Sequence, residues 1–333
     1  MASDQVVLVT GISGFLGSHV ADQFLEAGYR VRGTAREVSK VDAIKKTFDS
    51  KYGVGKVEVV AVPDITVEGA FDEAVKGVYA VAHVASILSF DKDPAKVIPA
   101  TVNATTSILN SCLAVPSIKR FVYTSSSVAV SMPKPNVPCS FDSSSWNEED
   151  VKAAWAPEPW GDSHHWTVYA ASKTEAEKTL WKFRDEKKPG FSINSVLPAT
   201  NFGPVITPDI VSSTAKCVPT IYSGNVKALL GVLPQYYIDV RDTGRLHVAA
   251  AKYPDVENQR LFGWVEPYNW NKVLAVLREI RPRHQFPEDV PGLGEDMSKV
   301  STVKEEELLH RMGRSGWTKL PEILEDGLKS MSM

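Results

Sequence analysis

Cysteine is scarce in this sequence: the 333 residues include only Cys112, Cys139 and Cys217. Their odd number and the lack of any short spacing argue against a disulfide framework and against a cysteine-based zinc site. The adjacent His164 and His165 do not replace them, because neighbouring residues rarely aim both rings at one ion and no third ligand is in view. We therefore expect reduced thiols in a cytoplasmic protein that holds no metal.

Long apolar runs and an excess of charge of one sign are also missing. No stretch reaches the roughly 18 uninterrupted apolar residues that a membrane span needs, and the opening MASDQVVLVTG does not resemble a secretory signal. The 37 Lys and Arg residues nearly balance 40 Asp and Glu, which gives a formal net charge of -3. Neither nucleic acid nor a membrane is therefore an expected partner, whereas a small molecule is.

What the sequence does contain is an alternation of short β-branched runs with helical stretches over roughly its first 200 residues, which is typical of βαβ units. The runs are almost wholly apolar, as expected of parallel strands with helices on both faces of the sheet. The expected strands span residues 6–10, 30–34, 57–62, 78–85, 120–125 and 192–197, and the expected helices span 15–27, 41–52, 68–76, 95–114 and 166–186.

Residues 132–165 interrupt this alternation with five prolines and three tryptophans. A long irregular connection inside a compact domain is often an active-site wall, and a surface insertion without a role is the alternative. After Pro198 the alternation loosens. We predict an α/β protein with a Rossmann-type, doubly wound parallel sheet in a first domain over residues 1–198. Residues 199–333 are expected to form mainly a smaller substrate-binding lobe, from which some strands or helices return to the core.

A glycine-rich turn follows the first expected strand, and a helical pattern begins directly after it. Glycines three residues apart allow a sharp turn and bring backbone N–H groups up to a pyrophosphate, at the positive end of the helix dipole. A purely structural turn is the alternative, but the place of this turn, after the first apolar strand of an α/β chain, favours a dinucleotide site. The expected cofactor contacts here are Gly11, Ser13, Gly14, Phe15, Leu16 and Gly17.

The end of the second expected strand indicates which dinucleotide binds. Folds that prefer NAD usually place an acidic residue there, whereas this sequence carries Arg36 and reaches its first acid only at Glu37. A guanidinium at Arg36, assisted by Arg32 or Lys40, can instead grip a 2′-phosphate through charge-assisted hydrogen bonds. NADPH is therefore favoured over NADH, with solvated arginines at a strand end as the alternative.

The next two expected strands end in Asp64-Ile65 and in His83-Val84-Ala85-Ser86. Ligands of open parallel sheets bind beyond these carboxyl ends, so Asp64, Ile65, Val84, Ala85 and Ser86 are further cofactor candidates, and Asp64 is suited to accept a hydrogen bond from the adenine amino group. His83 lies inside an apolar run and is expected in the core with its hydrogen bond satisfied.

Tyr169 and Lys173 stand four residues apart at the start of a helical stretch, so the phenol and the ammonium share one face of the helix. Hydride delivered to a carbonyl carbon leaves an alkoxide that needs a proton, and a phenol is better tuned to donate it beside a cation. Ser126, with Ser127 as the alternative, follows the fifth expected strand and can polarise the carbonyl. A Tyr/Lys pair alone also occurs on helix surfaces, but the ordered conjunction predicts a carbonyl reductase.

Three motifs in this order, Thr10-Gly11-x-x-Gly14-x-x-Gly17, residues 124–127 and Tyr169-x-x-x-Lys173, resemble those of the extended short-chain dehydrogenases/reductases. The runs 168–177 and 234–237 resemble fungal aldehyde and ketone reductases of the aldehyde reductase II type, relatives of dihydroflavonol reductase. The resemblance implies reduction of aldehydes or ketones, including ketoesters, to alcohols, with NADPH/NADP+ as cofactor and Ser126, Tyr169 and Lys173 as catalytic residues.

The same resemblance places further residues around the site. Asn103 matches a helix asparagine that supports the site through the backbone, and Pro198-Ala199-Thr200 stands where a nicotinamide-contacting turn lies. Ala199 replaces a glycine often seen there, which puts the local backbone path in doubt. Thr124, Tyr169 and Lys173 are also expected to touch the cofactor. Our candidates for the substrate pocket, beside Ser126, are Phe90, Trp166, Phe202, Gln235 and Tyr237, with plain core aromatics or surface polar groups as the alternative.

Two other functions share this pattern. A sugar-nucleotide epimerase or dehydratase would retain NAD, which Arg36 in place of an acid argues against. Such an enzyme would also need basic groups for a substrate diphosphate, and Lys and Arg are sparse in residues 199–235. A non-catalytic NADPH-sensing regulator would not need Ser126, Tyr169 and Lys173 together. Asp242 is expected to be the N-cap of a helix over 243–252 rather than a catalytic acid. The sequence leaves open a monomer or a homodimer.

Overall fold

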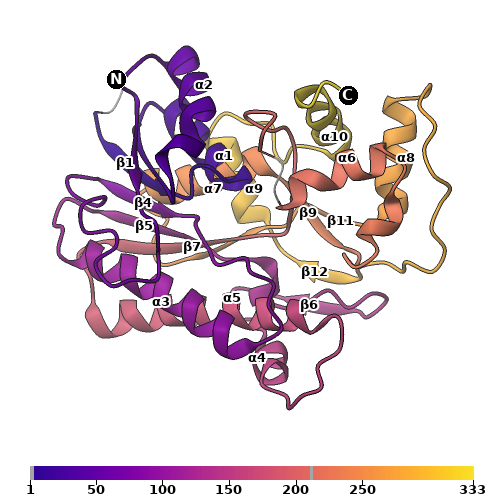
Figure 1. The fold of residues 1–333 in the computed structure, drawn as a ribbon, viewed down its shortest axis with the longest axis horizontal. Coiled ribbons are helices and arrows are strands. Elements are labelled where there is room, and N and C mark those ends of the chain that lie inside the picture. The colour runs from indigo at the N-terminus through magenta and orange to yellow at the C-terminus, as the bar shows by residue number, and fades with distance from the viewer. Residues whose placement is uncertain (1–3, 211–212) are drawn as a thin grey trace.

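A seven-stranded parallel sheet forms the centre of the computed structural model, which describes residues 4–210 and 213–333. The spatial order of its strands is β10-β7-β5-β4-β1-β2-β3, so the order reverses between β1 and β4 (Figure 1). Such a reversal opens a crevice at the carboxyl ends of the two strands. The strands are β1 (Val6–Thr10), β2 (Arg30–Ala35), β3 (Val57–Ala61), β4 (Ala80–His83), β5 (Arg120–Thr124), β7 (Ser192–Pro198) and β10 (Arg260–Gly263).

Helices cover both faces of this sheet, which confirms the predicted doubly wound α/β fold. Side chains alternate along β1, so Val7 and Val9 pack into one apolar cluster and Leu8 packs into another on the opposite face. In Figure 1 the helices above the sheet are α1 (Phe15–Glu26), α2 (Asp42–Tyr52), α7 (Val240–Lys252) and α9 (Val303–Arg311). Those below it are α3 (Pro94–Leu113), α4 (Glu148–Ala154) and α5 (His164–Lys187).

A smaller lobe packs beside the sheet and has an apolar core of its own. Its three-stranded sheet has the order β11-β9-β8, and β6 pairs separately with β12. The strands are β6 (Cys139–Phe141), β8 (Thr200–Phe202), β9 (Gln235–Asp239), β11 (Glu266–Tyr268) and β12 (Ser298–Val300), and the helices are α6 (Cys217–Tyr222), α8 (Trp270–Ile280) and α10 (Leu320–Ser330). Short 3-10 turns span Val38–Val41, Ser127–Ala129, Ser213–Lys216 and Val226–Leu229.

Three elements of the last third of the chain leave the lobe and pack on the first sheet. Strand β10 pairs with β7 at the sheet edge, helix α7 packs against α1, and α9 packs against α7. The sequence analysis did not identify β10, which is only four residues long. The expected division at residue 198 remains a prediction, and the chain crosses between the two parts more than once.

Two local predictions were wrong. Residues 68–76 form a series of turns instead of a helix, because Gly69 adopts a φ of +75° and the N–H groups of Ala70, Asp72 and Lys76 bond three residues back. Helix α7 begins earlier than expected, so its N-cap is Asp239, whose carboxylate accepts from the Arg241 N–H at 2.7 Å. Asp242 is instead buried inside the first turn, where it accepts from Arg245 and from the Thr318 N–H.

No helix within the described ranges is both long enough and apolar enough to cross a lipid bilayer.

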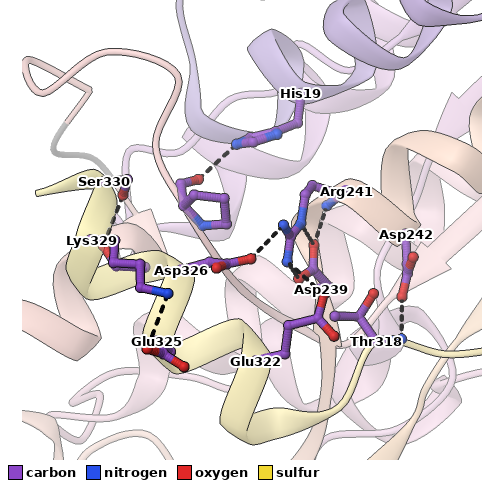
Figure 2. Close-up of polar contacts among 12 residues, drawn as sticks. His19, Asp239, Arg241, Asp242, Thr318, Glu322, Glu325, Asp326, Lys329 and Ser330 are labelled. Atoms are coloured by element: carbon purple, nitrogen blue, oxygen red, sulfur yellow. Dashed lines mark hydrogen bonds and ion pairs between the residues drawn. The ribbon is translucent and has the colours of Figure 1, made fainter. Parts of the chain in front are cut away.

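A polar cluster fastens the C-terminal helix α10 to the start of α7 (Figure 2). The Arg241 guanidinium donates to the Asp239 carboxylate at 2.7 and 2.9 Å and to Asp326 of α10 at 2.7 Å. The Ser330 hydroxyl accepts from the Val205 N–H at 3.0 Å. His19 of α1 contacts the Pro204 carbonyl oxygen at 2.7 Å, so the segment after β8 is held between the first and last helices.

Arg241→Leu is expected to lower the free energy of unfolding by about 3 kcal/mol, because the fully buried Asp239 carboxylate would lose its cation. Urea unfolding at neutral pH measures the change. The matched control is Lys329→Met, which breaks the exposed pair between Lys329 and Glu325 and should cost less than about 0.5 kcal/mol. Equal losses in the two variants would contradict the structural importance of the Arg241 cluster.

Candidate active site

The glycine-rich turn has the geometry of an anion site. Gly11 adopts a φ of +70° and its carbonyl accepts from the Gly14 N–H at 3.0 Å. A Cβ on Gly17 would lie 2.1 Å from that same carbonyl oxygen, so no side chain fits there. Helix α1 starts directly after Gly14, and the first N–H groups of a helix lack partners within it. Of the six expected contacts, Phe15 and Gly17 are buried, whereas Gly11, Ser13, Gly14 and Leu16 stay partly exposed.

The Thr10 hydroxyl organises the neighbouring end of β4. Its oxygen accepts from the Val84 and Ala85 N–H groups, both at 2.9 Å, so its proton points to His83 Nδ1 at 3.0 Å. Burial lowers the pKa of His83 to about 3, so the ring is neutral and that nitrogen accepts. The predicted core position of His83, with its hydrogen bond satisfied, is confirmed. Val84 and Ala85 are thereby fixed beside the glycine turn, where a Cβ on Gly11 would lie 3.2 Å from the Ala85 Cα.

Two residues that follow strand ends, Ser86 and Asp64, have hydrogen-bonding capacity that the described residues do not use. The Ser86 Oγ is buried and has no hydrogen-bond partner among the described residues. The Asp64 carboxylate uses one oxygen to accept from the Thr66 N–H and hydroxyl, which lowers the pKa of Asp64 and leaves the other oxygen for a ligand. Ile65, the next residue, is half-buried.

The three basic residues considered for a 2′-phosphate have different surroundings. Arg32 is engaged by Glu58 and by the Ala74 and Lys76 carbonyls, so it braces β2. Lys40 pairs with Glu37 at 2.8 Å. The Arg36 side chain is exposed, and within the described ranges it makes no hydrogen bond or ion pair. Arg36 is therefore the residue of the three that has its full donor set available.

Lys173 lies buried beneath the crevice, with 4% of its surface exposed. Its ammonium donates to the Thr124 carbonyl at 2.9 Å and lies 5.4 Å from the centre of the Tyr123 ring. Burial lowers the pKa of Lys173 to about 8, and the charge of Glu177 opposes that shift. A buried ammonium held at the carboxyl end of β5 is thus one turn from Tyr169 on α5.

Tyr169 and Ser126 come together above this lysine, and both are half-buried. Burial raises the pKa of Tyr169, and the interaction of its phenol with the Ser126 side chain opposes part of that rise. The Ser126 hydroxyl also accepts from the Val128 N–H at 3.4 Å, as the N-cap of the short turn that follows. The two hydroxyls predicted to meet at one carbonyl oxygen are therefore neighbours.

A histidine that the sequence analysis missed positions Thr124. His247 Nδ1 lies 2.8 Å from the Thr243 carbonyl, which can only accept, so this nitrogen carries the proton. Burial lowers the pKa of His247 to about 4, so Nε2 is free to accept from the Thr124 hydroxyl at 2.7 Å. The hydroxyl and the carbonyl of Thr124 are thus both engaged by protein groups.

The end of β7 is regular in spite of the alanine in the Pro198-Ala199-Thr200 turn. The Ala199 N–H donates to the Gly263 carbonyl at 3.0 Å, and Ala199 is not among the described residues with positive φ. The Thr200 hydroxyl accepts from Tyr268 at 3.2 Å. Asn103 is exposed on α3, and its side chain makes no hydrogen bond in the part of the chain described, so the support expected through its backbone stays a prediction.

Aromatic rings flank the Tyr169 phenol. The Phe90 ring centre lies 5.5 Å from that of Tyr169 and 5.2 Å from that of Trp166. Phe90 is 43% exposed and adopts a φ of +49°, which is strained for a bulky residue and is frequent near functional sites. Two of the expected pocket residues, Phe90 and Trp166, are therefore brought together beside the phenol.

A narrow cavity, partly open to solvent, lies between Ser127 and the smaller lobe. Its walls include Ala199, Gln235, Tyr236 and Trp264, and residues of the irregular connection from Ser131 onward. Phe202 and Tyr237, also expected in the pocket wall, are instead buried in the core of the lobe, where Phe202 packs against Tyr268 and Trp270. Strand side chains alternate in direction, and the sequence did not reveal which face of β8 and β9 meets the pocket.

Comparisons with known proteins agree with this geometry. The model of the NAD dependent epimerase/dehydratase family matches residues 7–262. Aldehyde reductase 2 of Sporidiobolus salmonicolor is 43% identical over 96% of this chain and 94% of that protein. The ketoreductase adrE of Penicillium roqueforti is 34% identical over 97% of this chain and 95% of its own.

Solved structures give the same picture. Yeast methylglyoxal/isovaleraldehyde reductase Gre2, complexed with NADPH, has a TM-score of 0.79 and 26% identity to this chain over 98% of both chains. The resemblance to fungal aldehyde and ketone reductases that the motifs predicted is confirmed. The glycine turn, the strand order and the match over residues 7–262 lead to one conclusion: the chain belongs to the NAD dependent epimerase/dehydratase family.

Proposed function

We propose that this protein is an NADPH-dependent carbonyl reductase that converts aldehydes and ketones to alcohols. One observation carries the proposal: the hydroxyls of Tyr169 and Ser126 adjoin each other above the buried Lys173 ammonium. Tyr169 lies in the first turns of α5, and Ser126 lies just after the carboxyl end of β5, in the same crevice as the glycine turn. Two proton-bearing oxygens at one point suit a carbonyl oxygen that gains charge and then a proton.

The residues of the crevice fit NADPH. The tight packing of Gly17 on Gly11 leaves bare backbone for a pyrophosphate, and the unpartnered Ser86 Oγ offers a polar contact. Arg36 supplies an unpaired guanidinium at the end of β2, where a 2′-phosphate needs charge-assisted hydrogen bonds. Within the named relatives, Gre2 was solved with NADPH, which supports the same choice here.

The chemistry divides between cofactor and protein. Bound NADPH supplies a hydride to the carbonyl carbon. Ser126 donates a hydrogen bond to the carbonyl oxygen, and Tyr169 transfers its phenolic proton to that oxygen, so the product is an alcohol. The Lys173 cation stabilises the phenolate that Tyr169 becomes, and Thr124 holds the ammonium in place.

The same proposal includes the surroundings of the reaction. Phe90 and Trp166 form an aromatic wall for the substrate, and the cavity beside Ser127 takes its distal part, with Gln235 as a polar group. The irregular connection of residues 132–165 then serves as an active-site wall. Cys112, Cys139 and Cys217 are free, which supports a reducing cytoplasmic location.

Tyr169→Phe is expected to lower kcat by about 10²- to 10⁴-fold, because the variant has no proton to donate. NADPH oxidation with a panel of ketoesters, aryl ketones and aldehydes measures the rate, and NADPH fluorescence titration should give an unchanged Kd. The matched control is Tyr253→Phe, which removes a phenol outside the site and should keep full activity. Tight NADPH binding without turnover of any carbonyl by the unaltered protein would point to a sensor instead of a reductase.

Arg36→Ala is expected to weaken NADPH binding by roughly ten- to a hundredfold, since one charge-assisted contact to the 2′-phosphate is worth about 1.5–3 kcal/mol. NADH lacks that phosphate, so its Kd should change less than about twofold. Arg283→Ala, which removes an exposed arginine from the smaller lobe, is the control. A uniform loss for both cofactors would remove the assigned role of Arg36.

The reduction rate is expected to fall as pH rises through about 8, because burial sets the pKa of Lys173 at about 8. Below that pH the ammonium is present and stabilises the phenolate, and above it the charge is lost. The measurement is kcat for one ketone over a range of about two pH units on either side of this pKa, which spans the titration of a single group. A rate that stays constant across the whole range would show that the lysine charge is not required.

A further inference from the structure

A buried carboxylate lies directly behind the catalytic lysine. Glu177 is one turn further along α5 than Lys173 and has no exposed surface. Its two oxygens accept from the Ser125 hydroxyl at 2.6 Å and from the Ser195 hydroxyl at 2.7 Å. These serines follow β5 and lie within β7, so the carboxylate joins the helix to two neighbouring strands. Ser125 is the residue immediately before Ser126.

Arg260 of β10 completes this site. Its Nε donates to Glu177 at 2.9 Å and its Nη2 at 3.3 Å. The remaining donors reach the Ser143 and Ser145 carbonyls at 3.0 and 2.6 Å, and the guanidinium lies 3.8 Å from the centre of the Trp146 ring. The pair thus also anchors the irregular connection, and four of the five N–H groups of Arg260 have partners.

Stability alone does not account for such a pair. Burying two charges costs desolvation free energy, and well-packed apolar residues of the same volume often serve as well or better. What apolar residues cannot supply is a fixed negative charge one turn from Lys173. The titratable groups that interact with the ammonium are His83 on β4, Tyr123 on β5 and Glu177 on α5. Among these described groups, Glu177 carries the negative charge.

We propose that Glu177 is a positioning residue, which keeps Lys173 charged and holds the Ser125–Ser126 segment against α5, and that Arg260 limits the strength of its field. The proposal rests on the carbonyl reduction proposed above and goes beyond it, since neither residue reaches the reacting atoms. The proposal predicts opposite electrostatic effects on Lys173 when either partner is removed. Without the Glu177 carboxylate, Lys173 experiences the uncompensated positive charge of Arg260. Without the Arg260 guanidinium, Lys173 experiences the uncompensated negative charge of Glu177.

The test compares the pH dependence of kcat in Glu177→Gln and Arg260→Met. At an effective dielectric constant of about 20, a charge roughly 8–10 Å away shifts a titration by about one pH unit. On the alkaline limb of the profile, kcat is therefore expected to fall at a pH roughly one unit lower in Glu177→Gln and at a pH higher by a similar amount in Arg260→Met. A purely structural role would lower kcat or stability in both variants without moving the limb in opposite directions.

Controls separate the possible failures. Arg260→Lys keeps the cation and should leave the limb unchanged, while Arg120→Met removes a buried arginine at the far end of β5 and should leave it unchanged too. If Glu177→Gln does not fold, as urea unfolding would show, the upward shift of Arg260→Met against Arg260→Lys still decides. Shifts of the same sign, or none, overturn the proposal, whereas an unaltered protein that reduces no carbonyl overturns the proposed function instead.

Discussion

The hydrogen bond from the Lys173 ammonium to the Thr124 carbonyl ties α5 to the end of β5. Tyr169 lies one turn before this contact and Ser126 two residues after Thr124, so one bond sets the separation of both hydroxyls. It is buried, where a hydrogen bond to a charged group is strong and costly to break. The distance between the Tyr169 and Ser126 hydroxyls is therefore fixed before a substrate binds.

Neutral histidines stabilise the same crevice from two sides. His83 accepts a hydrogen bond from the Thr10 hydroxyl, whose oxygen accepts from the Val84 N–H after β4. His247 accepts a hydrogen bond from the Thr124 hydroxyl. Both rings are kept uncharged by burial, so they fix hydroxyl orientations without adding charge near Lys173. Hydrogen bonds within the protein therefore organise the ends of β1, β4 and β5, which lowers the entropic cost of binding a ligand there.

Much of this could be predicted because it is local in the sequence. Apolar runs predicted six of the seven strands of the central sheet, five of them to within one residue at each end. The glycine turn and the Tyr169/Lys173 spacing predicted the candidate site. The bonds between Glu177 and Arg260 and between Thr124 and His247 join residues 83 and 123 positions apart, and no local pattern reports them. The turns at residues 68–76 were mistaken for a helix because composition outweighed the effect of Gly69. Which strand face holds Phe202 depends on tertiary packing in the same way.

Strand β10 has a consequence for how this architecture can diversify. It completes the seven-stranded sheet, yet it lies in the sequence between elements of the smaller lobe, after β8, α6 and β9 and before β11, α8 and α10, and its Arg260 touches both α5 and the irregular connection. A recombination between relatives at residue 198 would separate Arg260 from its partners on α5 and in the irregular connection. The smaller lobe therefore cannot be exchanged between relatives as one unit. New substrate preferences are more readily acquired through point changes in the loops that line the pocket.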